Sequence, residues 1–367
     1  MKRSDDIRSI VHQLNALAVK GLVPMFDPQR QLFCHKLKRT AAGLVQEGIS
    51  HRYTAITLMG LRRLEQSGVE SPIEIDRVVD VLLADTKWVD NIGDLGLLLW
   101  LSAQVAPDRL DELESRLDLK TALNRFRDAR QHRSMELSWF LTGLSYQVLA
   151  RPEKLAGTKD LALETYRRIV RNQGKEGIFG HSASNEGLSG MLRSGIGSFA
   201  DQVYPIYAMT KYSQAFGDDK AIKRAMDCAI TICEAQGSLG QWWWHYDSSN
   251  GRVAESFPVF SVHQHAMGPM TLLALGEAVQ SDFSPWIYKG LQWIDDNELG
   301  IDMKDNSANV VWRCIERTRP NRVWNAAVNL ITRREDRESR NGLRTLFECR
   351  PYELGWLLYA FANWNRS

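Results

Sequence analysis

The chain has 367 residues, is 44% hydrophobic and 25% charged, and carries a formal net charge of +2. This composition excludes intrinsic disorder, and the nearly balanced charge gives no electrostatic reason to expect a nucleic acid partner. The longest apolar run, near residues 95–101, is far shorter than the roughly 20 residues that span a membrane, and the charged N-terminus is unlike a signal peptide.

Apolar residues recur with helical spacing along the chain, and strand-like alternation is scarce. In chain order, half-exposed amphipathic helices are expected at residues 6–20, 73–86, 109–131, 158–173, 218–235 and 284–297. Between them, stretches that are apolar nearly all round predict buried helices at residues 51–66, 93–106, 135–150, 201–216, 263–279 and 352–364. Six buried helices inside six half-exposed ones predict an all-α (α/α)6 toroid, a double ring of six helical hairpins. We expect it to form a single domain over residues 1–367.

Three of the expected inner helices begin with one template, an acid, a leucine, a small residue and then apolar residues, at Asp94, Glu136 and Glu353. A carboxylate at a helix start caps the helix and favours the positive end of its dipole. If the inner helices begin at one mouth of the toroid, the same acids also ring its cavity. The long loops 177–201, 240–263 and 300–351 enter that mouth, so the active site is expected there.

A small motif recurs every 62 to 63 residues: Gln173 to Phe179, Gln236 to Trp242, and Lys289 to Glu298. The period predicts repeated helical hairpins that bury their apolar faces by stacking. The Gln-x-x-x-Gly-x-aromatic element resembles the QW repeat of squalene-hopene and oxidosqualene cyclases, in the terpenoid cyclase and protein prenyltransferase superfamily. The resemblance implies that the Gln caps an outer helix and the Trp stacks on a neighbouring turn. The chain lacks the Asp-x-Asp-Asp proton donor of those cyclases, the prenyltransferase zinc ligands, and a Cys-His-Gly element.

Two stretches near the expected mouth carry most of the candidate chemistry. In the run from Trp242 to Asp247, Trp242 fits the structural motif and Trp243 or Trp244 fits a pocket wall that faces a cation or a sugar ring. The candidate catalytic residues are Asp201, Asp247, His263, His265, His245 and Glu255. Helix capping and structural hydrogen bonding are the alternative roles. A metal site from three of these histidines and Asp247 is disfavoured because no spacing matches a known cage, so no metal is predicted.

The segment from Arg313 to Arg350 holds ten arginines, no lysine and five acids. Arginine without lysine suggests bidentate recognition of phosphate or carboxylate, although ion pairing on a charged helix explains part of it. The candidate substrate-binding residues are Trp243, Trp244, Tyr204, Tyr246, Gln202, Gln264, Arg313, Arg317, Trp312, Glu353 and Arg350.

The first function predicted is a class II terpene cyclase-like enzyme of the isomerase or lyase type. In it, Asp201 or Asp247 protonates an isoprenoid alkene, and His263 or His265 takes the final proton. The alternative is a carbohydrate-active enzyme, a hydrolase, lyase or epimerase on an acidic sugar, because such toroids also resemble six-hairpin glycosidases. A third reading is a non-catalytic scaffold that binds a lipid or peptide.

No cofactor is expected, with Mg²⁺ an option only for a diphosphate substrate. The partner is then a small isoprenoid or sugar, with no nucleic acid, while peripheral membrane contact and oligomeric state stay open. Five scattered cysteines without a Cys-x-x-Cys pair predict a reduced, cytoplasmic setting.

Overall fold

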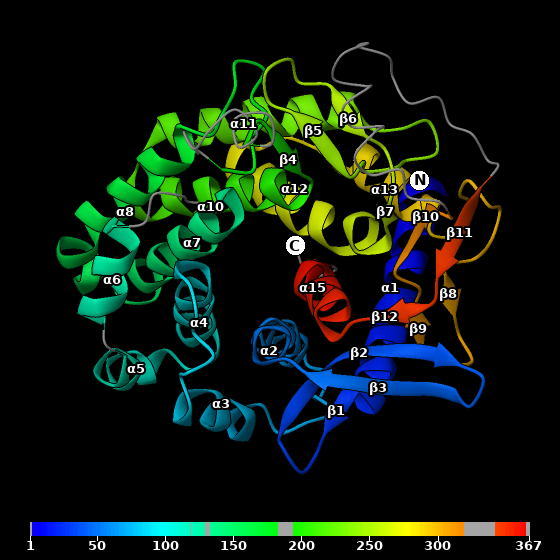
Figure 1. The fold of residues 1–367 in the computed structure, drawn as a ribbon, viewed down its shortest axis with the longest axis horizontal. Coiled ribbons are helices and arrows are strands. Elements are labelled where there is room, and N and C mark those ends of the chain that lie inside the picture. The colour runs from blue at the N-terminus through cyan, green and yellow to red at the C-terminus, as the bar shows by residue number, and fades with distance from the viewer. Residues whose placement is uncertain (1, 118, 129–132, 183–193, 319–341, 365–367) are drawn as a thin grey trace.

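The computed structural model describes residues 2–117, 119–128, 133–182, 194–318 and 342–364, and helices arranged in a double ring dominate it (Figure 1). The inner helices are α2 (His51–Gln66), α4 (Ile92–Val105), α7 (Ser134–Ala150), α10 (Ala200–Phe216), α12 (Gly268–Val279) and α15 (Pro351–Phe361). The outer helices are α1 (Lys2–Leu22), α3 (Ile75–Ala84), α5 (Leu110–Arg116), α6 (Leu119–Asp128), α8 (Leu155–Val170), α11 (Asp219–Glu234) and α13 (Ser284–Trp293).

The inner ring is closed by contacts between successive helices. Each inner helix contacts the next one in chain order, and α15 returns to contact α2. The predicted (α/α)6 toroid is therefore confirmed, and the inner helices begin within one or two residues of their predicted starts, apart from α12. Residues 263–267, predicted as the first turn of that helix, form a π-helical turn, η4 (His263–Met267), directly before it.

Glycines let neighbouring inner helices approach backbone to backbone. A Cβ atom built on Gly60 of α2 would lie 2.1 Å from the carbonyl oxygen of Gly355 of α15. A Cβ atom on Gly96 of α4 would lie 2.2 Å from Cα of Phe140 of α7. Since no side chain fits at these contacts, the ring is narrow, and the first residues of adjacent inner helices can reach one another.

The recurrent motif joins successive hairpins. Nε2 of Gln173 donates to the carbonyl oxygens of Gly177 in its own turn and Arg224 on α11, both at 3.0 Å. Nε2 of Gln236 makes the equivalent two bonds, also at 3.0 Å, to its own turn and to α13. The third copy differs, because Glu298 accepts hydrogen bonds from Trp293 and from a glutamine of the preceding hairpin. We call the Gln173 and Gln236 arrangements the braces.

A second repeated contact, not expected from the sequence, involves two glutamines predicted to bind substrate. Gln202 is buried, and its side-chain amide accepts from the backbone N–H of Phe179 and donates to the carbonyl oxygen of the same residue. Gln264 makes the same pair of bonds with the backbone of Trp242. Both glutamines therefore fix the turn that follows a brace, and their amides are not presented to a cavity.

Short strands are the main departure from the expected all-helical chain. They are β1 (Phe26–Asp27), β2 (Leu32–Thr40), β3 (Gly43–Ile49), β4 (Ile196–Ser198), β5 (His245–Asp247), β6 (Val253–Glu255), β7 (Val259–Phe260), β8 (Lys304–Asp305), β9 (Val310–Val311), β10 (Cys314–Arg317), β11 (Leu343–Leu346) and β12 (Glu348–Cys349). They form four small antiparallel sheets, of which the largest pairs β2 with β1, β3 and β12. Most of them lie in the three long loops that the sequence placed at the mouth.

The described residues contain no helix long and apolar enough to cross a membrane. The five cysteines are all buried and form no disulfide. Their burial removes them from the set of candidate nucleophiles, because desolvation raises the pKa of the thiols of Cys34, Cys233 and Cys314 to about 12.

Candidate functional site

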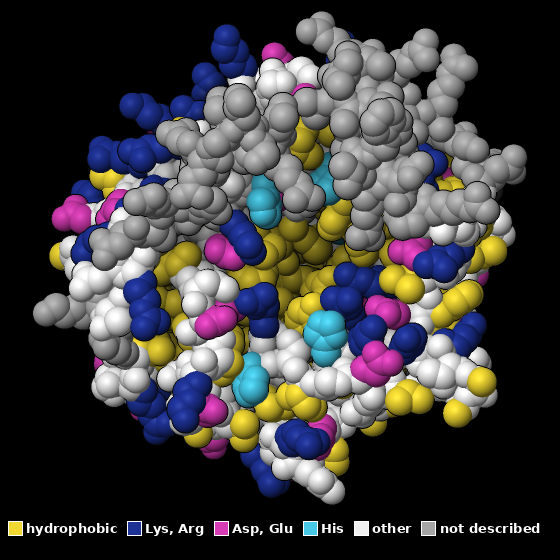
Figure 2. Space-filling model, in the orientation of Figure 1, with side chains coloured by type: hydrophobic (Ala, Val, Ile, Leu, Met, Phe, Trp, Pro, Cys, Tyr) yellow, Lys and Arg dark blue, Asp and Glu magenta, His cyan; other side chains and the backbone are white. Residues whose placement is uncertain are grey.

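The first residues of the inner helices meet at one end of the ring, which we call the mouth and define by Arg52, Asp94, Glu136, Asp201 and Glu353. Figure 2 shows a hollow at the centre of this face, with an apolar floor and with basic, acidic and histidine side chains around it. Aromatic side chains lie between the inner helices. Among them, Nε1 of Trp356 donates a hydrogen bond of 2.9 Å to the hydroxyl of Tyr204.

A guanidinium and a carboxylate join α2 to α4 at the mouth. Arg52 donates from Nε to Oδ1 of Asp94 at 2.7 Å and from Nη2 to Oδ2 at 3.0 Å. The Asp94 side chain is 1% exposed, whereas the Arg52 side chain is 38% exposed. The buried carboxylate therefore orients a guanidinium that stays accessible to a ligand.

The adjacent acid, Glu136, has a different environment. It begins α7 directly beside Gly93 of α4, and its side chain is 19% exposed. Burial raises the pKa of Glu136, the charge of Asp94 raises it further, and the charges of Arg133 and Arg52 oppose this shift. The two neighbouring acids thus differ: Asp94 is buried and bound in two-point fashion to Arg52. Glu136, whose Oε1 lies 3.4 Å from Nη1 of the exposed Arg133, is a partly accessible base of increased proton affinity.

A histidine that sequence reasoning missed lies beside Glu136. Nδ1 of His181 is 3.0 Å from Oδ2 of Asp201, and the side chains are 48% and 1% exposed. Asp201 also accepts hydrogen bonds from the N–H and hydroxyl of Ser198, which opens the turn before α10. The hydrogen bond to Asp201 raises the pKa of His181, and the charge of Glu136 adds to the effect.

Asp201, a predicted catalytic acid, is therefore buried and contacts His181, which lies between it and the solvent. The N–H of Ser134 on α7 donates to the carbonyl oxygen of His181 at 2.9 Å, which fixes His181 next to the helix that carries Glu136. The repeat could have found His181. It lies two residues after the aromatic residue of the first motif copy, the place that Trp244 takes in the second copy.

The opposite side of the mouth carries two of the predicted arginines. Arg313 forms an ion pair with Glu353, whose side chain is 1% exposed. Nη1 of Arg350 donates to the hydroxyl of Tyr53 on α2 at 2.9 Å. Arg313, Arg350 and Glu353, all predicted site residues, therefore lie on the same side of the mouth. Arg350 joins the start of α15 to α2, and this contact between the last and first inner helices, the seam, closes the ring.

Two other predicted residues of the arginine-rich segment, Arg317 and Trp312, pack against side chains of other parts of the chain. Arg317 lies with its guanidinium carbon 5.4 Å from the ring centroid of Phe257. Trp312 is buried, and the guanidinium of Arg39 covers its ring at 4.2 Å. Residues 319–341, which hold six of the ten arginines, lie outside the described residues.

A second histidine–carboxylate pair lies on the hairpin of β5 and β6. Nδ1 of His245 is 2.8 Å from Oε2 of Glu255, and the two side chains are 26% and 28% exposed. Asp247, predicted with them, instead accepts hydrogen bonds from Ser249 and Asn250 in the turn of the hairpin. Only His245 and Glu255 are thus combined in a way that supports proton transfer.

The two histidines of η4 are enclosed. His263 is 3% exposed and lies among the rings of Phe199, Trp244 and Phe260. His265 is fully buried, and neither ring nitrogen has a hydrogen-bond partner. Desolvation lowers the pKa of both imidazoles to about 3, so both are neutral at physiological pH.

Three predicted aromatic contacts have buried positions as well. Trp243 is 7% exposed, and its Nε1 donates to the carbonyl oxygen of Ala235 at 2.9 Å. Tyr246 is fully buried, and its hydroxyl accepts from the N–H of Trp243. Tyr204 is 4% exposed. Trp244 is partly exposed and stacks on His263, so it is the tryptophan of the run that can border the mouth.

The described residues contain no group of three or more His, Cys, Asp or Glu side chains placed to hold a metal ion. The histidines and Asp247 considered for such a site are divided between the enclosed η4 turn and the exposed hairpin.

Solved structures that are similar to this chain include glycosidases. An unsaturated glucuronyl hydrolase specific for heparin shares 15% identity over 98% of this chain and 97% of its own, with a TM-score of 0.62. An unsaturated glucuronyl hydrolase from Bacillus sp. GL1, responsible for the degradation of glycosaminoglycan, shares 13% over 99% and 97%, with a TM-score of 0.58. An inactive α-1,6-mannanase of a Salegentibacter species, in complex with an α-1,6-linked mannotetrose, shares 13% over 96% and 98%, with a TM-score of 0.58. Neither the protein-family models nor the curated proteins gave a match.

These neighbours overturn the resemblance to terpenoid cyclases. The predicted membership of that superfamily, the class II cyclase activity on an isoprenoid and the isomerase or lyase class are wrong, because the matching folds are six-hairpin glycosidases. The physical reason lies in the braces. A glutamine that donates to two main-chain carbonyl groups joins stacked hairpins in any ring, so the motif reports ring construction and carries no information on the reaction.

Proposed function

We propose that this protein is a carbohydrate-active enzyme that cleaves a glycosidic bond in an acidic sugar chain at the mouth. The observation that carries the proposal is the adjacent pair of Glu136 and His181. Both are partly exposed, both have a raised pKa, and each is held in the electrostatic field of the other. Such a pair, beside arginines fixed by buried carboxylates, fits acid–base cleavage of an anionic substrate.

The pKa shifts of His181 and Glu136 indicate which residue is the general acid and which is the general base. His181, with its pKa raised by Asp201, keeps its proton toward neutral pH and is the general acid. The raised pKa of Glu136 makes its carboxylate a stronger base than that of an ordinary glutamate, which fits the role of general base. As the bond between the anomeric carbon and the bridging oxygen breaks, His181 gives its proton to that oxygen. Water adds to the anomeric carbon, and its proton passes to Glu136.

Arginines at the mouth support an acidic substrate. Arg52, anchored by Asp94, presents an accessible guanidinium that can bind a carboxylate in two-point fashion. Arg350 and Arg313 approach from the other side. Trp244 supplies an aromatic face at the edge, and two of the similar solved structures are hydrolases of glucuronyl groups. We therefore propose a uronate as the sugar bound.

The test is incubation of the protein with saturated and unsaturated uronate oligosaccharides and with neutral mannan oligosaccharides, followed by mass spectrometry of the products. The wild type should shorten only the uronate chains, and Glu136→Gln and His181→Asn should each lose nearly all turnover. Arg77→Gln, an exposed change on the outer helix α3, is the matched control. No turnover of any uronate chain, or full turnover by Glu136→Gln, contradicts the proposal. Loss in Glu255→Gln alone would assign the reaction to the His245 pair.

A further inference from the structure

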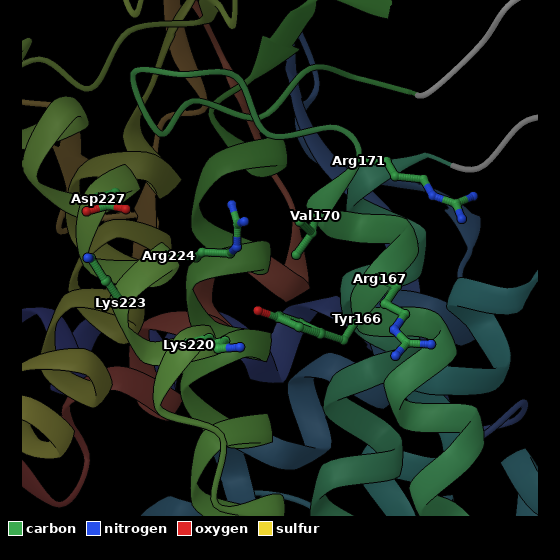
Figure 3. Close-up of a pocket in the computed structure, with 8 residues that line it drawn as sticks. All are labelled: Tyr166, Arg167, Val170, Arg171, Lys220, Lys223, Arg224 and Asp227. Carbon is green, nitrogen blue, oxygen red and sulfur yellow. The ribbon is translucent and has the colours of Figure 1, made fainter.

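A groove on the outer wall of the ring lies between α8 and α11, which we call the outer groove. Its volume is about 600 Å³. Arg167 and Arg171 line it from α8, and Lys220, Lys223 and Arg224 line it from α11, with Asp227 as the one lining carboxylate. Figure 3 shows Lys220 and Arg224 extending from α11 into the space that separates the two helices.

The cations of the outer groove are uncompensated. Within the described residues, Arg167, Arg171, Lys220 and Lys223 take part in no ion pair. By contrast, Arg109, directly before α5, is paired with two carboxylates. The nearest further acid, Asp218, is occupied as the cap of α11, where it accepts from two backbone N–H groups. In a chain with a net charge of +2, this concentration of positive charge attracts anions locally.

The walls of the groove are rigid. The first brace ties α8 to α11, and Nη1 of Arg224 donates to Oε1 of Gln173 at 3.0 Å. Tyr166 forms part of the floor, is 8% exposed, and stacks on Tyr212 with ring centroids 4.9 Å apart. A groove with fixed walls loses little conformational entropy on binding a ligand.

We propose that the outer groove binds an anionic sugar chain at a site separate from the mouth. Cations one helical turn apart, such as Arg167 and Arg171 or Lys220 and Arg224, are spaced about 6 Å along each wall. This spacing is comparable to the length of one sugar ring, so successive carboxylates of an extended polyuronate can meet successive cations. A single-stranded nucleic acid fits less well, because its bases need exposed aromatic faces and the Tyr166 ring is covered by Tyr212.

Arg171, which lines the outer groove, caps the C-terminal end of α8, and the chain then runs through the first brace to His181. The identity of the ligand rests on the proposed function, whereas the existence of an anion site does not.

The experiment measures binding of size-fractionated oligogalacturonate by calorimetry, in the Glu136→Gln background so that the chain is not cut. Arg167→Gln/Arg171→Gln/Lys220→Gln should weaken binding of long fragments about tenfold to a hundredfold, since three exposed charge contacts are lost. The matched control, Lys20→Gln/Arg77→Gln/Lys87→Gln, removes the same charge at exposed positions outside the groove and should bind as the background does. Equal melting temperatures verify that both triple variants are folded.

The outcomes separate this inference from the proposed function. If the groove variant binds as tightly as the control variant, the groove site is refuted whatever the enzyme cleaves. If single-stranded DNA of matched charge binds as tightly as oligogalacturonate and is lost in the same variant, the site is not a sugar site. If the wild type cleaves no uronate chain but the groove variant selectively loses oligogalacturonate, the groove inference stands and the proposed reaction fails.

Discussion

Removal of the guanidinium at the mouth should expose the cost of a buried carboxylate. In Arg52→Met the apolar stem is kept, but Asp94, at 1% exposure, loses two charge-assisted hydrogen bonds of 2.7 and 3.0 Å. Among the described residues, the hydrogen bond from the N–H of Asp90, at 3.3 Å, then remains. Breaking a fully buried pair in this way costs about 3–5 kcal/mol.

The partial exposure of Arg52 lowers this expected loss of stability. Because the Arg52 side chain is 38% exposed, water can enter the vacated space and solvate part of the carboxylate. We therefore expect Arg52→Met to reduce the free energy of unfolding by about 2–4 kcal/mol. Asp94→Leu leaves a guanidinium that water can hydrate, so its cost should be about 1–2 kcal/mol.

The assay is a double-mutant cycle with urea unfolding at pH 7, followed by tryptophan fluorescence and by circular dichroism. The double variant should be about 2 kcal/mol more stable than the sum of the single changes predicts, because it leaves no unpaired charge. Lys87→Gln, which removes an exposed charge, should change the free energy by less than about 0.5 kcal/mol. A coupling energy below about 0.5 kcal/mol would refute the reasoning, since the two side chains would then not stabilise each other.

The other predictions concern the acid–base pair and the braces. Burial raises the pKa of Glu136, so its ionisation destabilises the folded state as the pH rises through the folded pKa. The free energy of unfolding of Glu136→Gln, minus that of the wild type, should therefore be larger at pH 7 than at pH 4. Turnover by the variant should fall about 10²- to 10⁴-fold. Asp201→Asn removes the carboxylate charge on the group whose hydrogen bond raises the pKa of His181, so the alkaline limb of the kcat/KM profile on a uronate substrate should move to lower pH. An unmoved limb would exclude His181 as the acid. Gln236→Leu removes two hydrogen bonds of 3.0 Å to backbone carbonyls and should lower the free energy of unfolding by about 1–3 kcal/mol in urea melts, whereas the exposed change Gln13→Leu on α1 should have a much smaller effect.

The inner ring could be predicted from the sequence because its helices are buried on all sides. Stretches such as 135–150 are apolar nearly all round the helix, so neither the element nor its start depends on a choice of face. The hairpin of β2 and β3 could not be predicted in this way. All residues of β3 are partly or fully exposed, and its apolar residues Leu44, Val45 and Ile49 do not alternate with polar ones, so the alternation that marks a half-buried strand is absent. The predicted helix 109–131 is divided between α5 and α6, where Leu117 has an extended backbone.

The position of the candidate site could be predicted from the sequence, but the hydrogen-bond and ion-pair partners of its residues could not. The acids at the inner-helix starts were expected to ring the cavity, and Asp94, Glu136 and Glu353 do lie at the mouth. Their roles depend on which cation each meets, and Arg52 and Asp94 are 42 residues apart in the chain. His181 is a single histidine in a loop; its position in the repeat, equivalent to that of Trp244, is the sequence signal that could have found it, whereas its bond to Asp201 is visible only in the structure.

Ring closure has a consequence for the order of folding. The hydrogen bond that joins Arg350 to Tyr53 spans 297 residues, and α15 contacts α2 along the same seam. Closing so long a loop is entropically costly until the intervening hairpins have formed, so we expect the seam to form last. During synthesis on the ribosome, the Asp94 and His181 side of the mouth can assemble while the arginine side has no partner. The nascent open ring would expose the apolar edge of α2 until α15 emerges, and catalytic competence would appear only at that step.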